Sequence, residues 1–211
     1  MSKRRSTESS LKRIRQLKYL IEALDSSRIG NVRNIARISD LIDDLELEKS
    51  SSVDWKKVLD EIEYIYEIPK KDKEYTKILR LEKFSLILAF LSFIGIIGMG
   101  IAMYAFKNFF IYNFSLVLAL LAINMAYIIK FYVSIKINKI YLAHIDELEK
   151  HGNIVKEAIN FLLPKLRAEL KKARYPLEDF RLNLKLVDYD WISVRKKPSI
   201  LRSSYEVVFK K

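Results

Sequence analysis

Three residues with metal-ligating side chains share one predicted helix face. His144, Glu147 and His151 follow one another at spacings of three and four residues, which places them on the same side of a helix. Imidazole and carboxylate groups ligate several divalent metals, but no fourth ligand accompanies this set. We therefore interpret the three residues as structural, and we predict no metal site.

Two pairs of acidic residues are the remaining candidates for acid–base chemistry. Asp43 and Asp44 stand at a predicted helix end, and Asp188 and Asp190 lie beside a predicted turn. The chain contains no cysteine, which removes disulfides and cysteine-based metal or nucleophile chemistry. It also lacks a phosphate-binding glycine loop and the Gly-x-Ser-x-Gly, zinc and kinase signatures. The sequence thus predicts a non-enzymatic protein without catalytic or cofactor-binding residues and without a cofactor.

The central third of the chain carries a different signal, which is hydrophobicity. Two apolar segments, about 84–106 and 109–129, each exceed twenty residues and contain no charge, and only Lys107 and Asn108 separate them. A helix needs about 20 apolar residues to cross the roughly 30 Å hydrocarbon core of a bilayer. The sequence therefore predicts two transmembrane helices joined as a hairpin.

The charges on either side of these segments predict an orientation. The formal net charge of the chain is +12, and six Lys/Arg residues lie between Lys70 and Lys83, whereas Lys107 is the only charge at the turn. Because positive residues favour the cytosolic side, we expect a multi-pass protein of the cell membrane with both termini in the cytoplasm. Four basic residues are expected to reach the lipid headgroups: Lys77, Arg80, Lys83 and Lys130.

Small residues recur at helical spacing in both apolar segments. Such residues allow membrane helices to approach closely, and a two-residue turn makes the two segments antiparallel neighbours. We therefore predict that the two small-residue faces pack on each other. The residues concerned are Gly95, Gly98 and Ala102 in the first segment and Ser115, Ala119, Ala122 and Ala126 in the second.

Two amides interrupt the second apolar segment. Asn113 and Asn124 are eleven residues apart, so they share a helix face, roughly opposite the alanine face. An amide that faces lipid tails without a partner is unfavourable. One hypothesis is that this face meets another copy of the chain or another membrane protein. The alternative is that Asn113 reaches the outer headgroups while a neighbouring carbonyl satisfies Asn124.

The flanking segments predict small cytosolic structures. Helical periodicity predicts a three-helix bundle over 1–69. Its helices are expected at about 9–24, from Asn31 onward, and at about 54–67. The hairpin with its helix extensions is assigned to 70–151, where His151-Gly-Asn is expected to end the last helix. Residues 152–211 are expected to form a helix, kinked or split at Pro164, followed by three short strands. The predicted fold class is an all-α membrane protein with a transmembrane hairpin, cytosolic helices and a small C-terminal antiparallel β unit.

Three functions are compatible with this layout. The first is a non-enzymatic membrane protein whose hairpin anchors a basic cytosolic interaction domain and mediates association with itself or a partner. The second is an oligomeric pore gated by its cytosolic part; a two-span hairpin between cytosolic helices is similar in layout alone to some prokaryotic membrane effector modules. The third is a membrane tether for nucleic acid or ribosomes, based on the basic N-terminus and Arg195-Lys-Lys.

Overall fold

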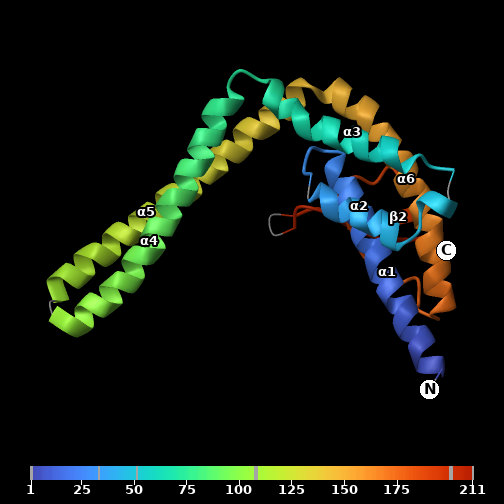
Figure 1. The fold of residues 1–211 in the computed structure, drawn as a ribbon, viewed down its shortest axis with the longest axis horizontal. Coiled ribbons are helices and arrows are strands. Elements are labelled where there is room, and N and C mark those ends of the chain that lie inside the picture. The colour runs from blue at the N-terminus through green and yellow to red at the C-terminus, as the bar shows by residue number, and fades with distance from the viewer. Residues whose placement is uncertain (1, 33, 51, 107–108, 200–201, 211) are drawn as a thin grey trace. The chain divides into compact units, whose positions relative to one another are not determined.

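The computed structural model describes the chain except residues 1, 33, 51, 107–108, 200–201 and 211. The described residues form six α-helices and one small sheet (Figure 1). They divide into two compact units: Met1–Glu67 together with His144–Lys211, and Ile68–Ala143. The first, discontinuous unit is called the terminal unit below, and the second is called the hairpin.

The terminal unit contains four of the helices and the sheet. In chain order its helices are α1 (Ser2–Ser27), α2 (Ile35–Asp44), α3 (Trp55–Glu67) and α6 (Ile145–Lys172), with a short 3-10 turn at Glu48–Ser50. Helix α2 begins after Asn34, whose side-chain oxygen accepts a hydrogen bond from the backbone N–H of Arg37 at 3.2 Å. The predicted cap, Asn31, is therefore wrong by one helical turn.

One hydrophobic core joins the two ends of the chain in this unit. Helix α1 contributes Leu17, Leu20 and Leu24, and α6 contributes Leu162 and Leu166, all at most 2% exposed. Helices α2 and α3 and the sheet add side chains to the same cluster. The sequence analysis places the terminal segments in separate domains because helical periodicity shows which face of a helix is buried, but not which element covers it.

Helix α6 is longer than the sequence predicts. It begins at Ile145 and continues without interruption through Gly152 and Pro164 to Lys172. The prediction that the helix ends at His151-Gly-Asn is wrong. Of the two alternatives at Pro164, the split does not occur, and the kink stays a prediction. Gly152 is buried within α6 beside Arg28, and it does not end the helix.

The three predicted strands are present and form one antiparallel sheet. They are β1 (Leu182–Leu184), β2 (Ile192–Lys196) and β3 (Tyr205–Phe209), in the order β1-β3-β2. Leu182 is paired with Val207, and Ile192 with Phe209, so that four apolar side chains face the core. A register shift between Val194 and Lys196 interrupts the pairing of β2 with β3.

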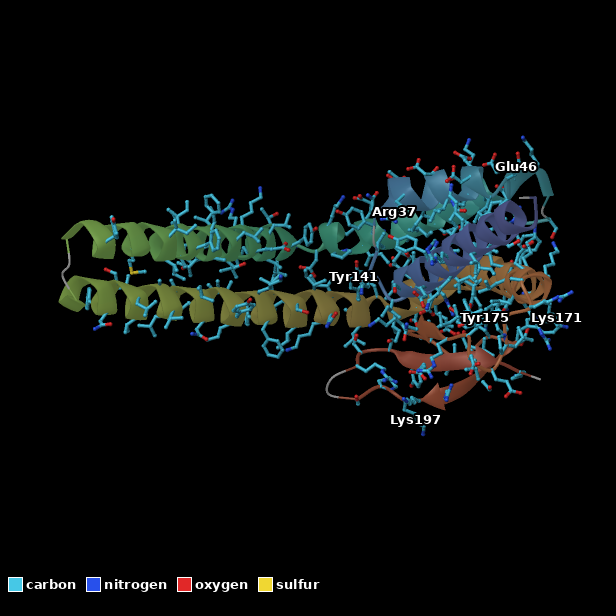
Figure 2. The ribbon with its side chains drawn as sticks, turned by 90° about the horizontal axis from the view of Figure 1, so that it is seen from below. Arg37, Glu46, Tyr141, Lys171, Tyr175 and Lys197 are labelled. Carbon is cyan, nitrogen blue, oxygen red and sulfur yellow. The ribbon has the colours of Figure 1, made fainter. Side chains whose placement is uncertain are left out.

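The hairpin consists of two long helices that lie side by side (Figures 1 and 2). After a short 3-10 turn at Ile68–Lys71, helix α4 spans Tyr75–Phe106 and helix α5 spans Phe109–Ala143. Both helices extend well beyond the uncharged segments that define them in the sequence. The predicted helical hairpin is therefore confirmed as a fold, and Lys107 and Asn108 at its turn lie outside the described residues.

Substitution in the shared core tests this arrangement of the terminal unit. Leu24 is fully buried, and Leu24→Ala should lower the free energy of unfolding by about 2–5 kcal/mol, because it removes apolar contacts and leaves a cavity. Leu11 on the same helix is 38% exposed, and Leu11→Ala should cost less than about 1 kcal/mol. Thermal unfolding in mild detergent, followed by circular dichroism, measures both. Equal effects would contradict the packing of α1 in the core.

Candidate functional site

The hairpin carries the most unusual surface of the protein. Helices α4 and α5 contain stretches, Tyr75–Gly100 and Asn113–Ala143, that are long and apolar enough to cross a membrane by length and composition. Only 11% and 17% of their most apolar windows are buried, whereas a core helix of a soluble protein is mostly buried. Large apolar side chains are instead exposed along both helices; they include Phe84, Phe90, Phe93, Ile97, Phe114, Leu121, Ile128 and Phe131.

Seven buried residues of α4 and α5 recur at seven-residue spacing. On α4 they are Ile78, Ser85 and Ser92, and on α5 they are Ala119, Ala126, Val133 and Ile140. A seven-residue repeat is the period of a left-handed coiled coil, in which one seam of each helix faces the other. The seam changes in character along the helices. Ile78, Val133 and Ile140 form a hydrophobic cluster, whereas serine and alanine occupy the remaining positions.

The hydroxyl groups of the two seam serines form hydrogen bonds within α4. Ser85 Oγ donates to the backbone oxygen of Glu82, and Ser92 Oγ donates to that of Leu88, both at 2.7 Å. Such bonds allow a small polar side chain to be buried at no further cost in hydrogen bonding. Neither serine belongs to the small residues predicted to pack, which in the first segment are Gly95, Gly98 and Ala102. The signal that could have found them is the seven-residue spacing from Ile78.

The small residues predicted to pack differ in burial between the two helices. On α5, Ala119 and Ala126 are buried, and Ser115 and Ala122 are half-buried. On α4, Gly95 is half-buried and Gly98 exposed, and a Cβ added to either glycine would meet no atom within 4 Å. The glycines therefore make no close helix contact within this hairpin. The remaining member, Ala102, lies among the residues whose side chains are not described.

The two predicted amides point away from the seam. Asn113 and Asn124 are both exposed. The Asn124 amide nitrogen donates to the backbone oxygen of Leu120, one turn earlier, at 2.8 Å. This is the bond to a neighbouring carbonyl that the alternative predicts for Asn124. It uses one donor of the amide and leaves the side-chain oxygen, which is a strong acceptor, available to another molecule.

The basic residues predicted at the headgroups are also at the surface of the hairpin. Lys77, Arg80 and Lys83 on α4 and Lys130 on α5 are all exposed. Between the two helices, Lys136 forms an ion pair with Glu74 at 3.3 Å. Contact of the four residues with lipid stays a prediction.

A buried polar cluster in the terminal unit was not anticipated from the sequence. The guanidinium of Arg28, just after α1, donates to both carboxylate oxygens of Asp188 at 2.7 and 2.8 Å and to the Tyr189 hydroxyl at 2.8 Å. Lys156 on α6 lies 3.0 Å from the same carboxylate. Burial is the largest single influence and opposes the charge of Arg28, but the hydrogen bonds and charges of Asp188 and Tyr189 together outweigh burial and raise the pKa of Arg28. The same bond is the main cause that lowers the pKa of Asp188.

Asp25 completes this cluster beneath Tyr189. The carboxylate is fully buried and accepts hydrogen bonds from the Tyr189 hydroxyl at 2.7 Å and from the backbone N–H groups of Lys185 and Leu186. Burial raises the pKa of Asp25, and it also raises the pKa of Tyr189. Because these polar groups bond to one another, the cluster holds the end of α1 to the segment between β1 and β2 and to α6. It has the geometry of a structural clamp.

The histidines considered as metal ligands bind different acids. His144 lies 3.3 Å from Glu147, whereas His151 is hydrogen-bonded to Glu61 on α3. Tyr64 joins the two pairs, because its hydroxyl donates to Glu147 at 3.2 Å and its ring stacks on His151 with 4.0 Å between the ring centres. In the part of the chain that the structure describes, no three histidine or acidic side chains converge on a position for a metal ion.

No protein-family model, curated protein or solved structure matches this chain.

The clamp predicts a pH-dependent effect for Asp188→Asn. A carboxylate whose pKa is lowered by folding stabilises the folded protein at pH values above its ordinary pKa of 3.8. The stabilisation is lost as the pH falls towards the lower pKa of the folded state. The variant should therefore unfold at a lower temperature than the parent protein at about pH 7, and the difference should shrink towards about pH 2. Thermal midpoints across this range measure it. The matched control, Asp190→Asn at an exposed neighbour, should show a smaller difference; an equal one would contradict the role of Asp188.

Proposed function

We propose that this protein is a non-enzymatic integral membrane protein in which α4 and α5 cross the bilayer and anchor the terminal unit as an interaction domain. The observation that carries the proposal is the exposed apolar surface of the hairpin. Transfer of one large apolar side chain out of water is favourable by about 1.5–3 kcal/mol, so the exposed set amounts to something on the order of tens of kcal/mol. A lipid environment removes this surface from water along both helices at once.

The backbone of the hairpin supports the same proposal. Polar backbone groups in the hydrocarbon region must be satisfied within the protein, and continuous helices meet this requirement. Helices α4 and α5 run for 32 and 35 residues. The uncharged segments 84–106 and 109–129 lie within them, while Lys77, Arg80, Lys83 and Lys130 stand near the ends of the apolar stretches. In this proposal those four side chains lie at the cytoplasmic headgroups, and both termini are cytoplasmic.

The topology can be tested with single cysteines, because the natural sequence has none. In intact cells, a membrane-impermeant maleimide should label Lys107→Cys at the turn but not Lys57→Cys or Lys172→Cys in the terminal unit. All three variants should be labelled after permeabilisation, and the cysteine-free protein is the control. Extraction of the protein by alkaline carbonate, or equal labelling at all three positions in intact cells, would contradict the proposal.

We further propose that the outer face of α5 mediates association with a second copy. Val117, Leu120, Asn124, Tyr127 and Phe131 follow one another at three- and four-residue spacing and are all exposed. In a membrane, a side-chain amide on such a face gains a hydrogen bond by pairing with a polar group of a neighbouring helix. Asn113 lies on the same face, one turn before Val117.

Removal of the two amides tests this association. The double variant Asn113→Leu/Asn124→Leu should shift the protein from oligomer towards monomer in mild detergent, because the interhelical hydrogen bonds are lost while the apolar surface is kept. Light scattering corrected for bound detergent measures the mass of the protein component. Asn138→Leu, an exposed amide on the same helix, is the matched control. An unchanged mass in the double variant would contradict the role of the amides.

The same measurement separates the pore from the anchor. A charge within the spans is usual for ion-coupled transport and proton relays, and the segments 84–106 and 109–129 contain none. Two spans are also too few to enclose a pore within one chain, so a pore would need several copies. A defined assembly of four or more copies, together with ion flux through liposomes, would favour the pore, and a monomer or dimer without flux favours the anchor.

A further inference from the structure

One carboxylate on the outer face of the sheet is surrounded by three arginines. Glu206 lies on the central strand β3, and its side chain is only 7% exposed. The Nε atoms of Arg181 and Arg195 lie 3.7 and 3.9 Å from Glu206 Oε1, and a terminal nitrogen of Arg202 lies 3.3 Å from Oε2. The three arginines, called the arginine cluster below, come from the residue before β1, from β2 and from the segment before β3.

The cluster holds more positive charge than its carboxylate neutralises. Three guanidinium groups share one carboxylate, and within the described residues no second acid lies within 4 Å of any of them. The arginine side chains are 49%, 43% and 35% exposed, so the acid lies beneath and the cations reach the solvent. The Oε1 atom of Glu206 is buried and accepts no hydrogen bond within the described residues, so Arg181 and Arg195 contact it as ion pairs at 3.7 and 3.9 Å and not through hydrogen bonds.

Hydrogen bonds of the described residues hold parts of the backbone near the cluster. Arg202 exchanges two hydrogen bonds of 2.9 Å with the backbone of Ser199. Arg195 lies at the register shift of β2, between Val194 and Lys196, and such irregularities re-aim side chains. The ammonium group of Lys185 donates to both the backbone oxygen and the hydroxyl of Ser203 at 2.8 Å. The arginines are therefore positioned by the sheet and its connections as well as by Glu206.

We propose that the arginine cluster is a binding site for a phosphate group, and that the phosphate belongs to the headgroup of an anionic lipid. The forked donors of guanidinium match the oxygens of phosphate, and two uncompensated positive charges attract a dianion or a phosphodiester. Glu206 holds the arginines together in the absence of ligand. The lipid assignment rests on the proposed membrane location of the protein, whereas the phosphate site itself does not.

The surroundings favour a lipid phosphate over nucleic acid. Single-stranded nucleic acids are bound by a basic groove combined with aromatic side chains on which bases stack. Around Glu206, the outward positions of the sheet hold Asn183, Ser193, Lys196 and Val208, and none of them is aromatic. Lys197, which points away from the unit beside these strands in Figure 2, adds further positive charge.

The test compares lipid binding by two double variants of the full-length protein in neutral detergent. Native mass spectrometry with an equimolar mixture of phosphatidylglycerol and phosphatidylcholine should show a preference of the parent protein for phosphatidylglycerol. Arg195→Gln/Arg202→Gln should reduce this preference about fivefold or more, and Arg195→Lys/Arg202→Lys should retain part of it, because charge remains without the fork. Lys171→Gln/Lys172→Gln, which removes two charges from the end of α6, is the control and should bind like the parent (Figure 2).

Two further measurements identify the source of the phosphate and check that the variants are folded. Titration with inorganic phosphate alone, followed by the same variants, would assign a soluble phosphate if it binds with the same arginine dependence and the lipid shows no preference. Thermal midpoints of the glutamine variant and its control should agree within a few degrees. Equal lipid binding by these two variants would overturn the site, as would arginine-dependent binding of single-stranded RNA without binding of lipid or phosphate.

The experiment also separates this proposal from the proposed function. The glutamine variant should remain in the membrane fraction after carbonate extraction, since the hairpin is unchanged. Loss of the parent protein from that fraction would refute the membrane anchor, while arginine-dependent binding of inorganic phosphate would still support the phosphate site.

Discussion

The packing of α1 against α6 is the interaction on which the rest of the structure depends. These helices come from opposite sides of the hairpin in the sequence, and their leucines lie in the same core. The chain therefore leaves the terminal unit at Glu67 and returns to it at His144. This closure requires the hairpin to begin and end at the same unit. If the hairpin crosses a bilayer, it must do so an even number of times, which is consistent with two spans and with both termini on one side.

The seam of the hairpin combines two ways of holding helices together. The cluster of Ile78, Val133 and Ile140 buries branched apolar side chains, as in a coiled coil in water. Towards the turn, Ser92, Ala119 and Ala126 replace them with small side chains. Close packing of small residues is the favoured solution where apolar surroundings provide no hydrophobic driving force between helices. The change along one seven-residue repeat thus agrees with the proposal that only part of the hairpin lies in lipid.

The terminal unit contains two charge clusters that differ in their charge balance. Around Arg28, each buried charge meets an opposite charge or a hydrogen bond, and the result is a clamp between three segments. Around Glu206, three cations share one acid and two positive charges remain. Burial of unpaired charge is costly, so such an excess persists only where the cations reach solvent or a ligand. This difference is the physical basis for interpreting the first cluster as structural and the second as a binding site.

The sequence by itself determined the elements that depend on local pattern. The two apolar helices, the three strands and the exposed position of Asn113 and Asn124 follow from the order of apolar and polar residues, because each pattern requires only a few neighbouring positions. Tertiary structure decided everything that depends on partners distant in the chain: the common core of α1 and α6, the continuity of α6 through Gly152, and the convergence of Arg28 on Asp188. A single sequence carries no signal for these contacts, since periodicity reports that a residue is buried but not which residue covers it. The arginine cluster illustrates the limit: its three arginines are separated in the sequence, and the pairing of β1 and β2 with β3 brings Arg181 and Arg195 within 4 Å of Glu206.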